Sequence, residues 1–156
     1  MPGKGVGCVA TSCLMPGHLL LRETPCLLLQ PGQGARSCLL AFQNMSKCHQ
    51  EQYLKLGNMF TKEESDWSTT AANDMAAMRS ELAAAPVTGL TMNDARTIWQ
   101  IKLTNSFHNG VCLRMSRFNH SCCPNAEYFW NPDTETRDVR VVRKVEQEQE
   151  VCLDYR

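Results

Sequence analysis

Short apolar runs bounded by glycine and proline mark the N-terminal part of the chain. Residues 19–21 and 26–29 are runs of strand length, and the pairs Pro16-Gly17 and Pro31-Gly32 favour turns beside them. Short apolar segments with such boundaries are typical of β-strands rather than of helices. The pattern therefore predicts a group of strands over residues 1–33.

The stretch over residues 37–107 is expected to be helical, and the apolar residues between 39 and 56 fall loosely on one face of a helix. Two signals predict helix starts here. Thr61, with Glu64 three residues later, precedes an alanine-rich segment, and Thr91, with Asp94 in the first turn, precedes another helical segment. Pro86 separates the two helices. The chain is thus expected to carry an all-helical insert between two β-rich parts.

Strand signals return over residues 111–156. Residues 126–130 lead into an Asn-Pro-Asp turn, residues 138–143 alternate between apolar and charged side chains, and residues 151–155 form a last strand-like run. The order strands, helices, strands predicts an α+β fold with a helical insertion. The length of 156 residues suits a single domain over 1–156.

Composition narrows the classes of function. The hydrophobic content of 43% is that of a globular protein, and equal numbers of basic and acidic residues, 16 each, argue against direct nucleic-acid binding. No apolar run approaches the roughly 18 residues of a membrane span. The nine cysteines include no Cys-x-x-Cys pair, and the N-terminus lacks a secretory pattern, so we expect free thiols and an intracellular protein of the cytoplasm or nucleus.

Candidate chemistry is concentrated in residues 117–125. His120 and Cys122 are the residue types of a nucleophile–base pair, but Pro124 disfavours the regular strand on which side chains two apart point the same way. A zinc site of His108, His120, Cys122 and Cys123 matches no common ligand spacing. We therefore expect neither a cysteine hydrolase nor a bound metal.

Asn119-His120-Ser121-Cys122-Cys123-Pro124-Asn125 resembles the NHSCxPN motif of the SET-domain protein lysine methyltransferases. Further segments resemble the same family in the same order: Gly5-Val6-Gly7 its opening GxG strand, Thr104-Asn105-Ser106-Phe107 the TNSF segment of its SET-and-MYND-like branch, and Glu150 with Tyr155 its terminal tyrosine motif. The chain has no MYND finger, and we expect no post-SET segment, because it ends at Arg156.

The resemblance implies a SET-type fold of several short β-sheets, with a threaded, knot-like C-terminal segment and a helical insertion. It also implies S-adenosylmethionine as the methyl donor. By resemblance, Gly5, Val6 and Gly7 would cradle its methionine part, and Asn105 and Asn119 would offer amides that both donate and accept hydrogen bonds. His120 would contact the cofactor largely through its backbone, against the adenine.

Tyr155 is the residue expected to act in catalysis. The implied reaction is methyl transfer to the deprotonated amine of a lysine, in a channel that Tyr155 lines, where a phenol orients the amine and the methyl group. The expected substrate is a lysine of a protein or peptide, histone or non-histone. We also expect that a partner protein or a second copy of the chain closes the open channel. The alternative is a catalytically incomplete SET-like interaction module that lacks a C-terminal lid.

One departure from the family pattern concerns a turn. Glu148-Gln149-Glu150 stands where the family usually has Gly-Glu-Glu, before the last strand. A tight turn that favours glycine is therefore expected to be distorted at this point.

Overall fold

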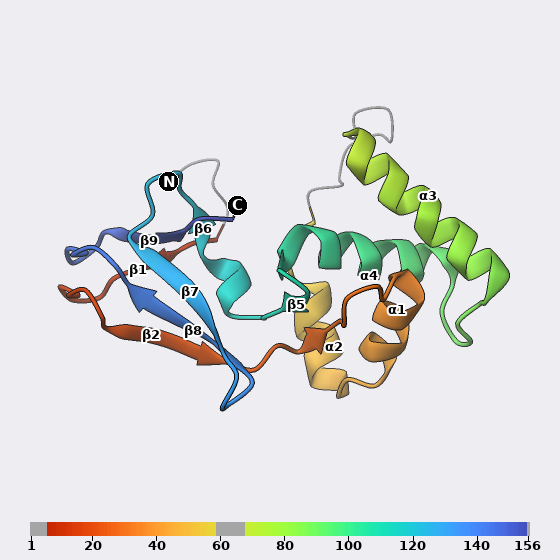
Figure 1. Ribbon diagram of the computed structural model, residues 1–156, viewed down its shortest axis with the longest axis horizontal. Coiled ribbons are helices and arrows are strands. Elements are labelled where there is room, and N and C mark those ends of the chain that lie inside the picture. Colours follow the sequence, from red (N-terminus) through yellow and green to blue (C-terminus); the bar gives the residue numbers. More distant parts are fainter. Residues whose placement is uncertain (1–5, 59–67, 156) are drawn as a thin grey trace. The chain divides into compact units, whose positions relative to one another are not determined.

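The computed structural model describes residues 6–58 and 68–155, and the chain falls into two compact units (Figure 1). The described part of the first unit consists of residues 6–25 and 112–155, and we call it the terminal unit. The second, which we call the helical unit, spans residues 26–111 apart from the undescribed 59–67. The predicted cap at Thr61 lies outside the described residues.

A three-stranded antiparallel sheet forms one half of the terminal unit (Figure 1). Its order is β2 (Leu19–Glu23), β8 (Thr136–Val141) and β7 (Ala126–Asn131), so the two strands of the C-terminal hairpin pair with an N-terminal strand. Leu21, Val139 and Val141 are buried on one face. The alternation of residues 138–143 thus predicted this strand's position, although the strand begins at Thr136.

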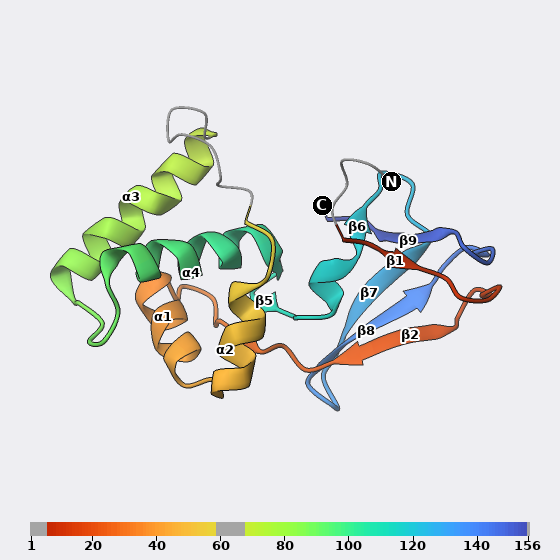
Figure 2. The same ribbon diagram turned by 180° about the vertical axis from the view of Figure 1, so that it is seen from behind.

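The second sheet of the terminal unit consists of three very short strands (Figure 2). The central strand β9 (Glu150–Leu153) pairs antiparallel with β1 (Cys8–Val9) and parallel with β6 (Asn119–His120). The 3₁₀ helix η2 (Met115–Arg117) precedes β6. The last strand ends at Leu153, so Tyr155 follows the strand, whereas the sequence pattern places it within the strand. Residues 154–156 are polar, so the alternation of apolar and polar residues that favours a strand does not continue past Leu153.

The helical unit contains α1 (Ala35–Gln43), α2 (Lys47–Leu54), α3 (Thr69–Ala84) and α4 (Met92–Asn105). Thr91 caps α4 as predicted: its hydroxyl accepts a hydrogen bond from the Asp94 amide, and Asp94 accepts one from the Thr91 amide. A small sheet of order β3 (Leu27–Leu28), β5 (Gly110–Val111) and β4 (Ser106–Phe107) closes this unit.

Buried apolar side chains from all four helices form the core of the helical unit. Tyr53 of α2 is fully buried, and its hydroxyl donates a hydrogen bond to the Ile98 carbonyl of α4 at 2.9 Å. This bond offsets the desolvation penalty of the buried hydroxyl. Other side chains of this core that are almost completely buried include Cys38, Leu39, Met75, Met78, Ile98 and Ile101.

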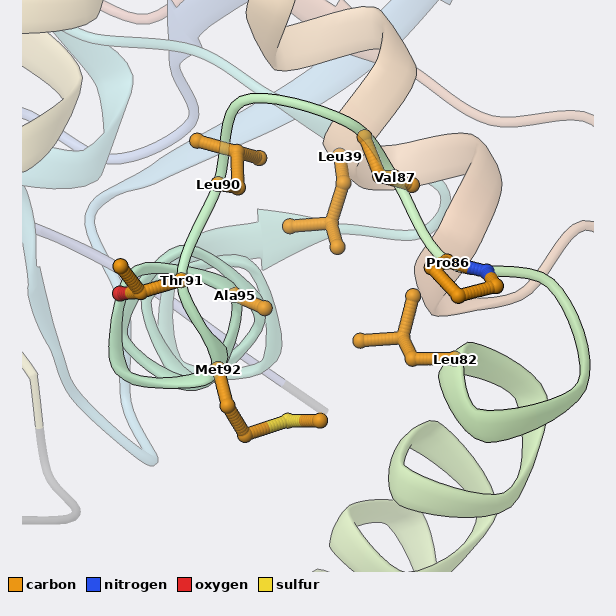
Figure 3. A pocket seen from close by; sticks show the side chains of 8 residues that line it. All are labelled: Leu39, Leu82, Pro86, Val87, Leu90, Thr91, Met92 and Ala95. Atoms are coloured by element: carbon orange, nitrogen blue, oxygen red, sulfur yellow. The ribbon is translucent and has the colours of Figure 1, made fainter.

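A small hollow lies where α1, α3 and α4 meet (Figure 3). Its volume is about 70 Å³, and Leu39, Leu82 and Ala95 are among its apolar lining residues. This volume is far below the several hundred Å³ of typical ligand pockets. The hollow is therefore a packing defect of the helical core and not a candidate functional site. Among the described helices, none has the length and hydropathy needed to cross a membrane.

Candidate functional site

The sheet β1-β9-β6 brings together most of the residues that the sequence singled out. Val6 and Gly7 directly precede β1, Asn119 and His120 form β6, and Tyr155 follows β9 by two residues. Gly5 lies outside the described residues, and Asn105 belongs to the helical unit. Segments more than a hundred residues apart in the chain thus meet at one edge of the terminal unit.

Gly7 permits a close contact between two polar side chains. The Asn119 amide donates a hydrogen bond to the Glu150 carboxylate at 2.6 Å. A Cβ at position 7 would lie 2.7 Å from Asn119 Nδ2 and 2.7 Å from Glu150 Oε1, closer than a carbon atom is tolerated. The backbone at Gly7 therefore passes close to this amide–carboxylate pair, and a larger residue at position 7 would require one or both of these side chains to shift.

Asn125 holds the C-terminal strand to the loop that follows β6. Its amide Nδ2 donates to the Glu150 carbonyl at 2.9 Å, and its Oδ1 accepts from the Cys152 amide at 2.9 Å. The Asn125 side chain thereby pairs with β9 as a neighbouring strand would. Since Asn125 is buried, these bonds fix the position of β9 beside β6.

His120 links the end of the chain to this loop. Its Nδ1 accepts a hydrogen bond from the Tyr155 amide at 3.2 Å and lies 3.7 Å from the Asp154 carboxylate. Because Nδ1 accepts, the ring proton is assigned to Nε2, which lies 3.3 Å from Cys122 Sγ. The rings of His120 and Tyr155 are 5.3 Å apart between centroids.

The hydroxyl of Tyr155 donates a short hydrogen bond to the Phe118 carbonyl. Partial burial raises the pKa of Tyr155 above its usual range, and negative charge on the Cys152 and Cys8 thiols would raise it further. Burial also raises the pKa of the Cys8 thiol. The phenol is therefore protonated at neutral pH and acts as a hydrogen-bond donor. About half of the Tyr155 side chain remains exposed, so it stays accessible from solvent.

Asn105 ends α4, and its side chain is buried within the helical unit. Its Nδ2 donates to the Gly57 carbonyl at 2.6 Å and to the Ile101 carbonyl at 2.9 Å. Both amide hydrogens of Asn105 are thus used inside this unit. The predicted role of Asn105 in cofactor binding stays a prediction.

The expectation that Pro124 would keep His120 and Cys122 apart is wrong. β6 ends at His120, and Ser121 continues the pairing through a bond from its amide to the Leu153 carbonyl, so the chain bends only after that point. This leaves Cys122 Sγ within 3.3 Å of His120 Nε2. Residues 6–58 and 68–155 contain no group of three or more His, Cys, Asp or Glu side chains placed to hold a metal ion.

Several residues of this site were missed in the sequence or assigned no role there. Glu150 was noted in the sequence only as part of a motif. Its hydrogen bond with Asn119 is found only in the folded chain. Phe118 contributes a backbone carbonyl, for which a sequence contains no signal. Arg143 lies beside Cys123, and charge alone did not distinguish it from other arginines.

Comparison with known proteins places the chain in a family. The sequence pattern of the SET domain matches residues 5–156. The chain belongs to the SET domain family. The predictions of family and of an α+β, SET-type fold are thereby confirmed, whereas the knot-like threading of the C-terminal segment stays a prediction.

Individual relatives agree with this assignment. The chain is 26% identical over 155 residues to the histone-lysine N-methyltransferase set5 of Schizosaccharomyces pombe, a match that covers 99% of this chain and 40% of that protein. The chain therefore spans about two fifths of the length of this curated relative.

One solved structure shows the same fold. A crystal structure of the SET domain of LSMT bound to lysine and AdoHcy is similar with a TM-score of 0.66 and 11% identity, over 99% of this chain and 48% of that one. The Neurospora SET domain protein DIM-5, a histone lysine methyltransferase, has a TM-score of 0.45 and 12% identity, over 100% of this chain and 50% of that one.

Proposed function

We propose that the chain is a protein-lysine N-methyltransferase that uses S-adenosylmethionine. The observation that carries this proposal is the convergence of Gly7, Asn119, His120 and Tyr155 on one small sheet. Membership of the SET domain family supports it, as does the similarity to set5, a histone-lysine N-methyltransferase. The LSMT structure, which holds lysine and AdoHcy, supports the same substrate and cofactor.

The residues present fit the chemistry of the proposed cofactor. S-adenosylmethionine would supply an electrophilic methyl group on a positively charged sulfonium. Val6 and Gly7 are both exposed, so a ligand can approach the backbone of this segment. The carboxylates of Glu150 and Asp154 lie beside Asn119 and His120 and favour a cation there. Gly5, Val6, Gly7, Asn105, Asn119 and His120 are the residues proposed to hold the cofactor.

The acceptor amine must be neutral before it can attack a methyl group. The pKa of a free lysine is near 10.4, so deprotonation at neutral pH costs about 4.6 kcal/mol, and a cation beside the amine lowers that cost. The Tyr155 oxygen and the Phe118 carbonyl form a pair of acceptors at hydrogen-bonding distance from each other. We propose that they bind the N–H groups of the amine and direct its lone pair, so that Tyr155 contributes through positioning and polarity.

The whole chain is proposed to act as one SET domain over residues 1–156, with N-terminal strands in 1–33, a helical insert over 37–107 and C-terminal strands in 111–156. The proposed acceptor is a lysine of a protein, histone or non-histone, and the name of the relative set5 supports a histone. A partner protein or a second copy of the chain would close the lysine channel. The proposed location is the cytoplasm or the nucleus.

Two measurements on wild-type chain and on Tyr155→Phe test the proposal. Calorimetry with S-adenosylhomocysteine should detect binding to both proteins with affinities within about twofold, because the hydroxyl acts on the amine. Transfer of a labelled methyl group to a mixture of histones and other cell proteins should fall by about 100-fold in Tyr155→Phe. Tyr128→Phe, in strand β7 of the same unit, serves as the control and should retain activity.

Three outcomes would contradict the proposal. Absence of S-adenosylhomocysteine binding at high ligand concentration argues against the cofactor site. Binding without any methyl transfer favours the alternative of a SET-like interaction module. Equal activity of wild type and Tyr155→Phe argues against the role of the phenol.

A further inference from the structure

Glu23, the last residue of β2, binds the backbone of a segment that is distant in the sequence. Its Oε1 accepts a hydrogen bond from the Arg114 amide at 2.9 Å. Its Oε2 accepts from the Met115 amide at 2.9 Å and from the Arg114 amide at 3.2 Å. The carboxylate therefore joins β2 to the segment that leads into β6.

The two amides that bind Glu23 lie at the start of the 3₁₀ helix η2. Arg114 is the N-terminal capping residue of η2, and Met115 is its first residue. The first amides of a helix have no partner within the helix, so they need an acceptor from elsewhere. A carboxylate suits this place because it has two oxygens and because hydrogen bonds to an ionised acceptor are stronger than those between neutral groups.

The same helix ends at Phe118, whose carbonyl accepts the hydrogen bond of the Tyr155 hydroxyl. The Phe118 amide donates to the Met115 carbonyl at 3.1 Å, which closes the turn. Met115 is fully buried, and Phe118 is 7% exposed. A single turn of three residues thus separates the amides that bind Glu23 from the carbonyl that binds Tyr155. A change at the start of so short a turn is transmitted to its end.

We propose that Glu23 is a positioning residue for the proposed methyl transfer, on which this inference rests. Its carboxylate holds η2 where the Phe118 carbonyl meets the Tyr155 hydroxyl, so that the two oxygens are placed to bind the N–H groups of an acceptor amine. Both oxygens of Glu23 are occupied by backbone amides, so the residue acts through η2 and not through contact with the amine.

Arg22, the neighbour of Glu23 in β2, offers a matched comparison. It donates two hydrogen bonds to the Asp138 carboxylate, at 2.7 and 2.6 Å, across the pairing of β2 with β8. Within the described part of the chain, the hydrogen-bond partners of Asp138 lie in β2 and β8 and none lies in η2. Asp138→Asn therefore weakens the attachment of the same strand without removing a bond to η2, and it controls for general loss of stability.

The hydrogen bond on the Phe118 carbonyl can be measured without substrate. The chain contains a single Phe-Asn pair, Phe118-Asn119. Protein labelled with carbon-13 at phenylalanine carbonyls and with nitrogen-15 at asparagine amides therefore gives one signal in a spectrum that correlates each amide with the preceding carbonyl. A carbonyl carbon resonates at lower frequency once it loses its donor, so Tyr155→Phe provides the reference for the broken bond.

In Glu23→Ala the carbonyl signal should move in the direction of this reference, by a similar amount, whereas in Asp138→Asn it should stay at the wild-type frequency. Glu23→Gln keeps one acceptor oxygen at the same side-chain length and should move the signal less than Glu23→Ala does. Glu23→Gln also keeps the test open if Glu23→Ala does not fold.

Methyl transfer provides a second readout. At saturating S-adenosylmethionine, the rate with a mixture of histones and other cell proteins should fall about 10- to 100-fold in Glu23→Ala, because the acceptor amine is misplaced. The affinity for S-adenosylhomocysteine should stay within about twofold of wild type. The double variant Glu23→Ala/Tyr155→Phe should be no slower than Tyr155→Phe alone, because both substitutions remove the same interaction.

The proposal is overturned if the Phe118 carbonyl signal of the Glu23 variants stays at the wild-type frequency, or if Asp138→Asn moves it as far. It is equally overturned if the double variant is much slower than Tyr155→Phe. The carbonyl measurement involves neither the cofactor nor a lysine, so its failure is distinguishable from a failure of the proposed methyl transfer.

Discussion

Glu148 adopts a backbone conformation that residues other than glycine rarely take, with a φ of 67°. The turn that contains it is nevertheless formed, since the Gln149 amide donates to the Glu146 carbonyl at 3.1 Å and the Glu148 amide donates to the Ala10 carbonyl at 2.8 Å. The expected distortion is therefore strain at one residue and not loss of the turn. This turn leads directly into Glu150, the partner of Asn119.

We predict that Glu148→Gly stabilises the protein. Relief of the left-handed conformation is worth about 1–2 kcal/mol, and the greater flexibility of glycine in the unfolded chain offsets about 0.5–1 kcal/mol of it. The free energy of unfolding, measured by urea titration, should therefore rise by about 0.5–1 kcal/mol. Glu148→Ala retains the strain and should show no such gain; a gain of equal size would assign the effect to the lost carboxylate instead.

A second prediction concerns Gly7. In Gly7→Ala the new methyl group meets Asn119 Nδ2 and Glu150 Oε1, so at least one of these two side chains must move. Overpacking of this kind costs about 1–3 kcal/mol, which corresponds to about a 5- to 150-fold loss of affinity for S-adenosylhomocysteine if the strain acts on the cofactor site. Gly57→Ala is the control, because nothing lies within 4 Å of its added Cβ. Equal affinities of both variants would argue against a cofactor site at Gly7.

The candidate site residues were found in the sequence only where side chain identity determines the chemistry. Tyr155, Asn119 and His120 belong to recognisable motifs, and the structure brings them together. Phe118 acts through its carbonyl, and the close approach of Asn119 and Glu150 to Gly7 is a contact that the GxG motif does not reveal. Such roles depend on the packing of distant segments, which no local pattern encodes.

At the level of elements, the position of β9 depends on hydrogen bonds from the Asn125 side chain as well as on its own ladder bonds. The strand has four residues, and the Asn125 side chain supplies one donor and one acceptor to its backbone. A strand this short gains little from its ladder bonds alone, and the buried amide therefore matters for its position beside β6.

We predict that Asn125→Ala lowers the free energy of unfolding by about 2–4 kcal/mol, because one buried donor and one buried acceptor of β9 lose their partners. Asn93→Ala, on the exposed surface of α4, should change it by less than about 0.5 kcal/mol. Urea titrations of both variants make the comparison. Similar losses of unfolding free energy in the two variants would mean that water forms hydrogen bonds with the backbone of β9 when Asn125 is absent.

Long elements were predictable and short ones were not. The cap at Thr91 predicted the start of α4 because the capping box is a local signal. The apolar face expected over residues 39–56 instead forms two helices, since the Ser46 hydroxyl caps α2 by accepting from the His49 amide. The two-residue strand β6 was not predicted, because only its pairing with β9 defines it.

For the whole molecule, the order of strands, helices and strands in the sequence corresponds to the two units. The chain leaves the terminal unit after Pro25 and returns to it at Cys112. The strands of the terminal unit pair across this gap, for example β2 with β8, whereas the pairings of β3, β5 and β4 stay inside the helical unit. The sequence pattern predicted the helical insertion, but strand partners more than a hundred residues apart follow from the fold of the family.

The stability of the terminal unit is expected to depend on acid through Asp138. Arg22 donates two hydrogen bonds to this buried carboxylate, at 2.7 and 2.6 Å, and Arg140 lies 3.7 Å away. The hydrogen bonds from Arg22 lower the pKa of Asp138 against the opposing effect of burial, and the hydroxyl of Thr136 and the charges of Arg22 and Arg140 add to the lowering.

A carboxyl group whose pKa is lower in the folded state stabilises the fold above the unfolded value of about 3.9, and this contribution is lost as the pH falls through the folded value. We therefore predict that Asp138→Asn is less stable than wild type at neutral pH and that the difference shrinks as the pH falls from about 5 to about 2. Urea titrations across this range measure it, with Asp133→Asn in the exposed turn after β7 as the control. If the difference in unfolding free energy stays constant over the range, the Asp138→Asn variant loses only packing and hydrogen bonds. The charge of Asp138 would then not stabilise the pairing of β2 with β8.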